Sequence, residues 1–143
     1  MKSAEKDSNE IKKAKQKLGK TIRKLREKQE FSLRELARAV DLPPSNMKYI
    51  EDGVNTPSPD KYISIIRYLS PDSKKRDELD TSYSIIRGTP PPDVCNIICK
   101  NKELNDVLRI IDGQKLNSNQ IEQLKVLIKS FRRETEKGEK DND

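Results

Sequence analysis

The chain has 143 residues, of which 31% are hydrophobic and 38% are charged, and it contains no histidine and two cysteines. This composition supplies a small helical core, with or without an accessory region, and excludes a large one. Apolar runs are only a few residues long, so we expect neither a membrane-spanning helix nor a signal peptide, and we expect a cytoplasmic protein.

The positive charge is concentrated at the start of the chain. The net charge is +6, and residues 1–30 hold eleven Lys/Arg against five Asp/Glu, whereas residues 31–70 hold five of each and residues 71–143 fourteen of each. A lysine-rich segment can simply be a well-solvated helix. Because of the motif that follows it, we favour an electrostatic footprint for a nucleic acid.

Apolar residues recur at helical spacing through this first segment, at Ile11, Ala14, Leu18, Ile22 and Leu25. Two interpretations remain open. Either a helix capped by Ser8 runs through to Gln29, with Gly19 as an interior position costing up to ~1 kcal/mol relative to alanine, or residues 1–17 form a frayed basic arm and the helix begins near Leu18.

The next segment, residues 32–53, predicts two short helices joined by a tight turn. Ser32 and Glu35 form a capping box, in which each side chain satisfies the backbone N–H of the other residue. The box precedes an apolar stripe made of Leu33, Leu36, Ala37 and Val40. Pro43 then ends this helix, because a proline biases the preceding residue away from the helical region.

The second helix of this pair begins at Pro44, where a first-turn residue needs no N–H donor. Met47 and Ile50 form its buried side, and Gly53 supplies a left-handed cap. The side chains left facing outward are Ser45, Asn46, Lys48, Tyr49 and Asp52. This layout predicts a helix-turn-helix, whose second helix enters the major groove of DNA.

Two further helices follow the motif. Ser58 caps the first, which begins at Pro59 and buries Tyr62, Ile63, Ile66 and Leu69. The second begins at Pro71 or Ser73 and runs to Gly88, with an inward face of Leu79, Ser82, Tyr83 and Ile86. Both helices are expected to close the core beneath the helix-turn-helix.

The stretch from Gly88 to Asp93 contains three prolines and marks the expected domain boundary. Three short helices follow: one opens with Val94, Ile97 and Ile98, one carries Leu104, Val107, Leu108 and Ile111 and ends at Gly113, and one is capped by Asn117 or Ser118 and carries Ile121, Leu124, Leu127, Ile128 and Phe131. They are too small for a core of their own, so they must pack on the first domain, on each other or on a second copy. Residues 133–143 predict a disordered charged tail.

Catalytic and metal-binding patterns are absent from the sequence. Histidine, the commonest general base, is missing, and no glycine-rich phosphate loop is present. Cys95 and Cys99 have no further soft ligands grouped nearby, and a disulfide between adjacent helical turns would be strained. We therefore expect no enzyme, no cofactor and no metal site. We expect the cysteines to be buried thiols, with a redox switch or an intermolecular disulfide as the alternative.

From about Leu18 to Leu69 the chain resembles the phage-repressor family of helix-turn-helix proteins, of the Cro/CI or XRE-like type. The resemblance rests on LREKQEFSLRELARAV, on NMKYIEDG and on PSPDKYISIIRYL. It implies an all-α fold: a λ-repressor-like five-helix domain over residues 18–88, with its motif at 32–53, followed by a short helical region at 89–132. It also implies a sequence-specific transcriptional regulator, usually a repressor, that inserts the helix 44–52 into double-stranded DNA as a homodimer.

The resemblance assigns roles to individual residues. The base-contacting positions of the family fall on Pro44, Ser45 and Tyr49, and Asn46 and Lys48 lie on or beside the same surface. Its arginine–glutamate ion pair falls on Arg26 and Glu51. The side chains expected to contact phosphates are Lys20, Arg23, Lys24, Arg34 and Arg38.

The sequence departs from the family pattern at several of these positions. Leu33 replaces a glutamine that donates to phosphate, Pro44 removes a base-reading side chain, and Glu30 stands where a helix-ending glycine is common. Two other functions stay open. One is an antitoxin that represses its own operon and binds a toxin through residues 93–132, and the other is a protein–protein adaptor that has lost specific DNA binding.

Overall fold

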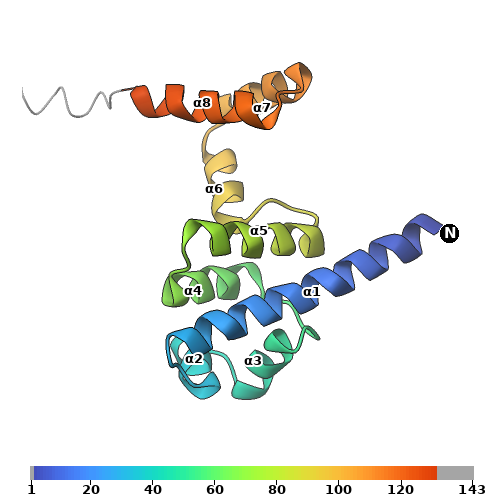
Figure 1. Cartoon of the computed structure of the whole chain (residues 1–143), viewed down its shortest axis with the longest axis vertical. Coiled ribbons are helices and arrows are strands. Elements are labelled where there is room, and N and C mark those ends of the chain that lie inside the picture. Colours follow the sequence, from blue (N-terminus) through green and yellow to red (C-terminus); the bar gives the residue numbers. More distant parts are fainter. Residues whose placement is uncertain (1, 132–143) are drawn as a thin grey trace, which may run out of the picture. The chain divides into compact units, whose positions relative to one another are not determined.

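The computed structural model describes residues 2–131, with side chains described from residue 7, and within that range the chain forms eight helices and no strand (Figure 1). The all-α class is therefore confirmed. The helices are α1 (Lys2–Lys28), α2 (Leu33–Ala39), α3 (Pro44–Glu51), α4 (Pro59–Leu69), α5 (Ser73–Arg87), α6 (Pro92–Lys100), α7 (Glu103–Gln114) and α8 (Ser118–Ser130). The expected tail, residues 133–143, lies outside the described residues.

The chain divides into two compact units, one with α1 to α6 and the other with α7 and α8. This division falls after Lys100, not at the proline-rich break after residue 88 where we expected a domain boundary. Contacts explain the difference: Pro92 is buried, α6 contacts α4, and Asp93 accepts a hydrogen bond from Arg76 of α5 at 3.2 Å. The domain limits 18–88 and 89–132 themselves remain predictions.

Helix α1 is one continuous helix from Lys2 to Lys28, so the first of the two interpretations describes it, although it begins six residues before Ser8. Its apolar stripe buries Ala14, Leu18 and Ile22. The helix packs against α5 on one side and against α3 on another (Figure 1). It is therefore the element on which the helix-turn-helix and the rest of the first unit are assembled.

The core beneath the helix-turn-helix is formed largely by α4 and α5. The rings of Tyr62 and Tyr83 stack with their centroids 4.3 Å apart, and both side chains are buried. The Tyr62 hydroxyl donates to Asp80 at 2.6 Å. Burial of the ring is the main cause that raises the pKa of Tyr62, and the hydrogen bond to Asp80 is the second. Ile65 is completely buried although the sequence pattern did not single it out, and Ile63 is only half-buried.

The helices of the second unit form where the sequence placed them, with one correction. Asn117 caps α8, and Gln120 completes a capping box with it. Gly113, which we expected to end α7, lies inside the helix. The helix instead ends at Gln114, and Lys115 takes the left-handed conformation with φ 50°. No residue of α7 or α8 is buried.

Gly19 explains how closely α1 and α3 approach each other. A Cβ atom at this position would lie 2.5 Å from the carbonyl oxygen of Glu51, and it would clash with the carbonyl oxygen of Ile50 as well. These are backbone atoms, which cannot move aside as a flexible side chain can. The glycine therefore costs α1 helix propensity but allows the two backbones to meet.

We predict that Gly19→Ala lowers the free energy of unfolding by about 1–3 kcal/mol, because overpacking must push α3 away from α1. Gly113→Ala is the matched control: a Cβ there meets nothing within 4 Å, so the better helix former should leave stability unchanged or raise it by up to ~1 kcal/mol. Urea denaturation followed by circular dichroism measures both. Equal stability of the two variants would contradict the close approach.

Candidate nucleic-acid interface

The first helix of the pair, α2, is held at its start by the predicted capping box. The backbone N–H of Ser32 donates to the Glu35 carboxylate at 2.6 Å, and the Glu35 N–H donates to the Ser32 hydroxyl at 3.1 Å. The hydrogen bond from the Ser32 backbone lowers the pKa of the Glu35 carboxyl. The turn after α2 requires a left-handed residue, and Asp41 takes that conformation with φ 54°.

The second helix, α3, buries one side and leaves the other exposed. Met47, Ile50 and Glu51 form the buried side. The five side chains expected to read bases, Pro44, Ser45, Asn46, Lys48 and Tyr49, are all exposed. Tyr49 is the largest of them and retains 48% of its surface accessible. Together they form one exposed face, here called the α3 face.

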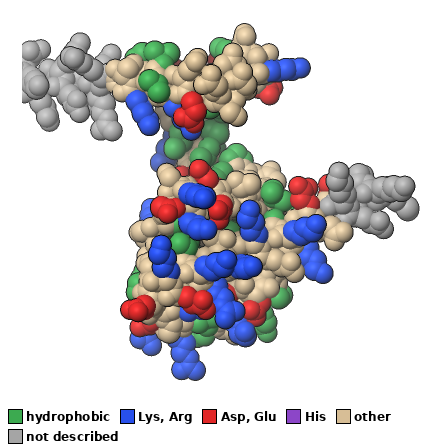
Figure 2. Space-filling view, in the orientation of Figure 1, with side chains coloured by type: hydrophobic (Ala, Val, Ile, Leu, Met, Phe, Trp, Pro, Cys, Tyr) green, Lys and Arg blue, Asp and Glu red, His purple; other side chains and the backbone are tan. Residues whose placement is uncertain are grey.

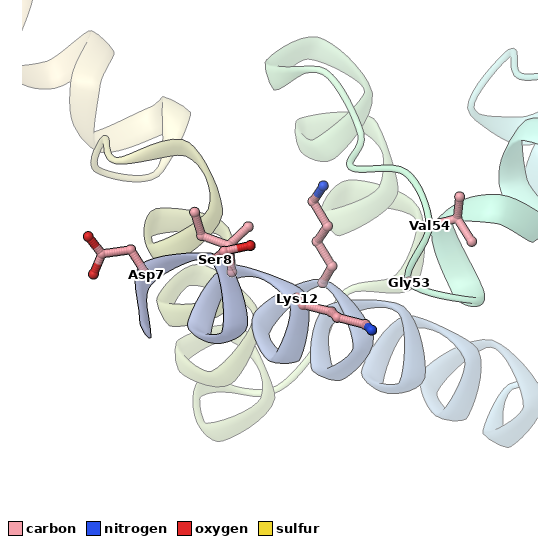
Figure 3. Close-up of a pocket in the computed structure, with 7 residues that line it drawn as sticks. Asp7, Ser8, Lys12, Gly53 and Val54 are labelled. Atoms are coloured by element: carbon pink, nitrogen blue, oxygen red, sulfur yellow. The ribbon is translucent and has the colours of Figure 1, made fainter. Parts of the chain in front are cut away.

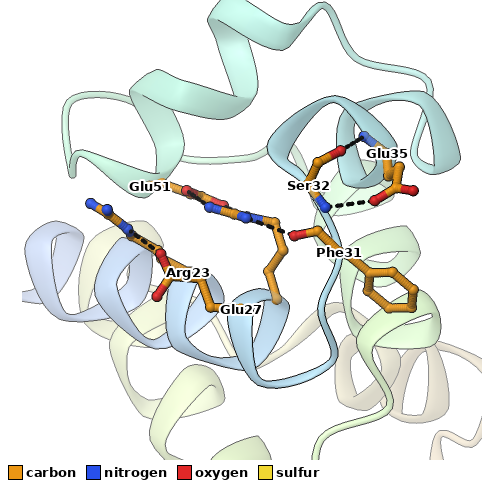
Figure 4. Close-up of polar contacts among 7 residues, drawn as sticks. Arg23, Glu27, Phe31, Ser32, Glu35 and Glu51 are labelled. Atoms are coloured by element: carbon orange, nitrogen blue, oxygen red, sulfur yellow. Dashed lines mark hydrogen bonds and ion pairs between the residues drawn. The ribbon is translucent and has the colours of Figure 1, made fainter.

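The orientation of α3 is fixed by a buried ion pair with α1 (Figure 4). Arg26 donates through Nε to one carboxylate oxygen of Glu51 at 2.6 Å and through Nη2 to the other at 3.0 Å. Its Nη1 donates to the backbone carbonyl of Phe31 at 2.8 Å. The hydrogen bond to Glu51 raises the pKa of the guanidinium, so Arg26 stays charged. One side chain thus joins α1, α3 and the turn between α1 and α2.

Two basic side chains that the sequence did not single out hold the loops on either side of α3. Lys61 of α4 donates to the carbonyls of Val40 at 3.0 Å and Asp41 at 2.9 Å, which end α2. Arg87 of α5 donates to the carbonyl of Pro57 at 2.9 Å. In both contacts a cationic side chain bonds a backbone carbonyl that is distant in sequence. No local sequence pattern could have predicted which carbonyl it bonds.

Charged side chains near the α3 face are partly paired. Lys48 contacts Asp52, the residue that follows α3, at 3.2 Å. The charge of Asp52, one of the side chains expected to face outward, is therefore partly balanced by Lys48. Arg23 pairs in the same way with Glu27 at 3.0 Å (Figure 4), and both members are about half exposed.

The other side chains expected to contact phosphates differ in position. Arg34 and Arg38 are exposed and lie one turn apart on α2. Lys20 and Lys24 are exposed on α1, but they lie about 100° and 140° around the helix axis from Gly19, the residue that touches α3. Contact of any of these residues with phosphate stays a prediction.

The first half of α1 also lies beside the loop that follows α3. Gly53 has φ 76°, and its Cα carries no side chain where the backbone of Gln16 passes. A surface hollow of about 590 Å³ lies here between the two segments (Figure 3). Lys12 and Lys15 line it on α1, and Val54 lines it on the loop.

The two cysteines do not match the expectation of buried thiols. Both are free, Cys95 is half-buried and Cys99 is exposed, because α6 presents this side to solvent. Among the described residues, no group of three or more His, Cys, Asp or Glu side chains is placed to hold a metal ion. No helix in the described part of the chain is long and apolar enough to cross a membrane.

Comparison with protein families matches residues 17–79 to a family described as a helix-turn-helix domain. The matched range begins inside α1 and ends inside α5, so it contains α2, α3 and α4 in full. The first half of α1 and the helices α6 to α8 lie outside it. Comparisons with curated proteins and with solved structures gave no match.

We predict that Glu51→Gln lowers the free energy of unfolding by roughly 3–5 kcal/mol, because it leaves the buried guanidinium of Arg26 without a carboxylate. The side chains of this pair are only 10% and 4% exposed. Glu27→Gln is the matched control, since it removes the partner of the exposed Arg23 and should cost less than ~1 kcal/mol. Chemical denaturation gives both values, and similar losses in the two variants would rule out the structural role of the buried pair.

Proposed function

Because residues 17–79 form a helix-turn-helix domain, we propose that this protein is a sequence-specific DNA-binding transcriptional regulator that acts as a repressor in the cytoplasm. The observation that carries the proposal is the α3 face. The opposite side of α3 is held against α1, where Glu51 of α3 bonds Arg26 and the α3 backbone lies against Gly19. The α3 face itself is exposed along the whole helix. A rigidly held helix with a free polar side is what insertion into a major groove requires.

The side chains of the α3 face differ in what they read. Asn46 has the geometry to bond adenine bidentately, whereas the Ser45 hydroxyl donates or accepts at several base edges and specifies weakly. Tyr49 offers a hydroxyl to a base or phosphate and a ring to a thymine methyl. Lys48 meets a phosphate or a guanine edge, and Pro44 contributes only apolar contact.

Contacts to phosphates set the position of the domain on the duplex. Arg34 and Arg38 are the best placed, since they are exposed on α2, the helix that precedes the turn. Arg23 of α1 is paired with Glu27 at 3.0 Å, and both side chains are about half exposed. Such an exposed pair contributes little, so phosphate replaces the carboxylate at small cost.

We propose further that the protein is a homodimer joined through α7 and α8. These helices carry exposed apolar side chains, among them Val107, Ile110, Leu127, Ile128 and Phe131, and they bury none of their residues. Residues 101–131 contain five Lys/Arg and four Asp/Glu. Because this surface is apolar and almost neutral, a second copy meets no net repulsion there. A homodimer would supply the two α3 helices that a pair of half-sites about 34 Å apart requires.

The DNA-binding proposal predicts that the protein prefers duplex from upstream of its own gene over scrambled duplex by ~10³-fold or more. Tyr49→Ala and Asn46→Ala should each weaken that specific binding roughly 10-fold, since each removes a base contact. Asn96→Ala, which truncates an exposed asparagine on α6, should have no effect. Fluorescence anisotropy at two salt concentrations measures all four proteins. Equal affinity for both duplexes would refute specific regulation and favour an adaptor.

The dimer proposal predicts that Leu127→Glu converts the protein to a monomer, because a carboxylate cannot be buried at an apolar interface without a partner. Asn119→Glu adds the same charge on the polar side of α8 and should leave the dimer intact. Sedimentation equilibrium distinguishes the two states. A wild-type monomer that forms a complex with a small protein encoded beside it would instead support the antitoxin function.

A further inference from the structure

Five lysines of α1 lie on one face of the helix. Lys13, Lys17, Lys20, Lys24 and Lys28 are spaced by four, three, four and four residues, and all five are exposed. Such spacing keeps side chains on one side of an α-helix. The row extends for about 22 Å along the helix axis, and we call it the lysine stripe. Figure 2 shows Lys and Arg side chains gathered along α1 in this view.

The lysine stripe does not share a face with α3. Gly19 and Arg26 mark the side of α1 that touches α3. At about 100° per residue, Lys24 lies about 140° around the axis from Gly19 and about 160° from Arg26. A duplex that receives α3 in its major groove lies on the side of α1 that α3 covers, whereas the lysine stripe faces away from that side. The proposed function therefore does not use the stripe.

The positive charges of the lysine stripe are not paired with acidic side chains of the described residues. None of its five lysines forms an ion pair with another described residue, whereas Arg23 on the same helix does. At the C-terminal end of the stripe, Asp72 lines a hollow of about 400 Å³ together with Lys24, Lys28 and Lys75, and Glu27 is paired with Arg23. Asp72 is engaged as the cap of α5 through the Lys75 N–H at 2.8 Å. Glu10 is exposed on the turn that precedes Lys13.

We propose that the lysine stripe binds the phosphate backbone of a second DNA duplex, so that the protein holds two DNA segments at once. Lysine is a hydrated point charge that contacts phosphates without reading sequence. A protein-binding surface would instead be depleted in lysine and enriched in aromatic residues, and no apolar side chain interrupts the stripe. The row is long enough to follow several phosphates of one strand. This proposal rests on the proposed function only for the first segment, the one held by α3.

The first test uses a short random-sequence duplex and the salt dependence of its affinity. Replacing Lys13, Lys17, Lys20 and Lys24 by glutamine should reduce the slope of log K against log salt by about 3.6, since each of the four phosphate contacts contributes about 0.9. The matched control replaces four exposed lysines elsewhere, Lys100, Lys102, Lys115 and Lys129, and should keep the wild-type slope. Glutamine and lysine have similar helix propensities, so both variants should fold.

A triple variant of the α3 face, with Ser45, Asn46 and Tyr49 replaced by alanine, separates the two proposals. It should lose the preference for upstream DNA and keep binding of the random duplex. Loss of both would show that the stripe is not a separate surface. An unchanged slope in the stripe variant would overturn the proposal as well. Failure of the regulator proposal looks different, because the wild type would then lack sequence preference while the stripe variant still lost its salt-dependent binding.

The second test asks directly for two duplexes on one protein. Wild-type protein on an immobilised upstream duplex should retain a labelled random duplex, and the stripe variant should bind the first and release the second. If the wild type retains no labelled duplex but retains poly-glutamate, the stripe is a docking surface for an acidic protein and the DNA proposal is wrong.

Discussion

The close contact between α1 and α3 is the constraint on which the rest of the first unit depends. Its two parts need each other: the bare Cα of Gly19 lets the backbones approach, and the guanidinium of Arg26 then reaches the Glu51 carboxylate within 2.6 Å and 3.0 Å. A buried ion pair of this kind is not an efficient way to stabilise a fold. Its contribution is to fix the relative orientation of the two helices, because a bidentate pair forms in only one arrangement. The orientation of the exposed side of α3 is thereby fixed as well.

Much of the local structure could be predicted because its causes are local. The capping box at Ser32, the proline that starts α3 and the cap at Asn117 each act within a few residues, and the apolar stripes follow from helical period. The proposed readers on α3 followed from the same period together with a family resemblance, and their exposure agrees with it, although their contact with DNA stays a prediction.

What could not be predicted depends on distant parts of the chain. From the sequence, Gly19 was predicted only to weaken the helix. The structure shows that the α3 backbone lies against it, which no local pattern indicates. Nothing in the local sequence around Lys61 or Arg87 indicates their partners, which are backbone carbonyls twenty or more residues away. Gly113 was predicted to end α7, but a glycine ends a helix only when it takes the left-handed conformation after the last turn. Here Lys115 takes that conformation instead, so Gly113 stays inside the helix. The direction in which Lys20 and Lys24 face likewise required knowing which side of α1 meets α3.

The bare apolar sides of α7 and α8 have a consequence for how the protein would respond to its own abundance. A helix pair that buries none of its residues gains little by folding alone, so the dimer proposed above would stabilise it. While most copies are monomers, the amount of such a dimer, and with it the pairing of two α3 helices on one site, would rise with the square of the monomer concentration. The molecule would thus act as a threshold detector of its own synthesis, largely idle when scarce and engaged once enough copies have accumulated.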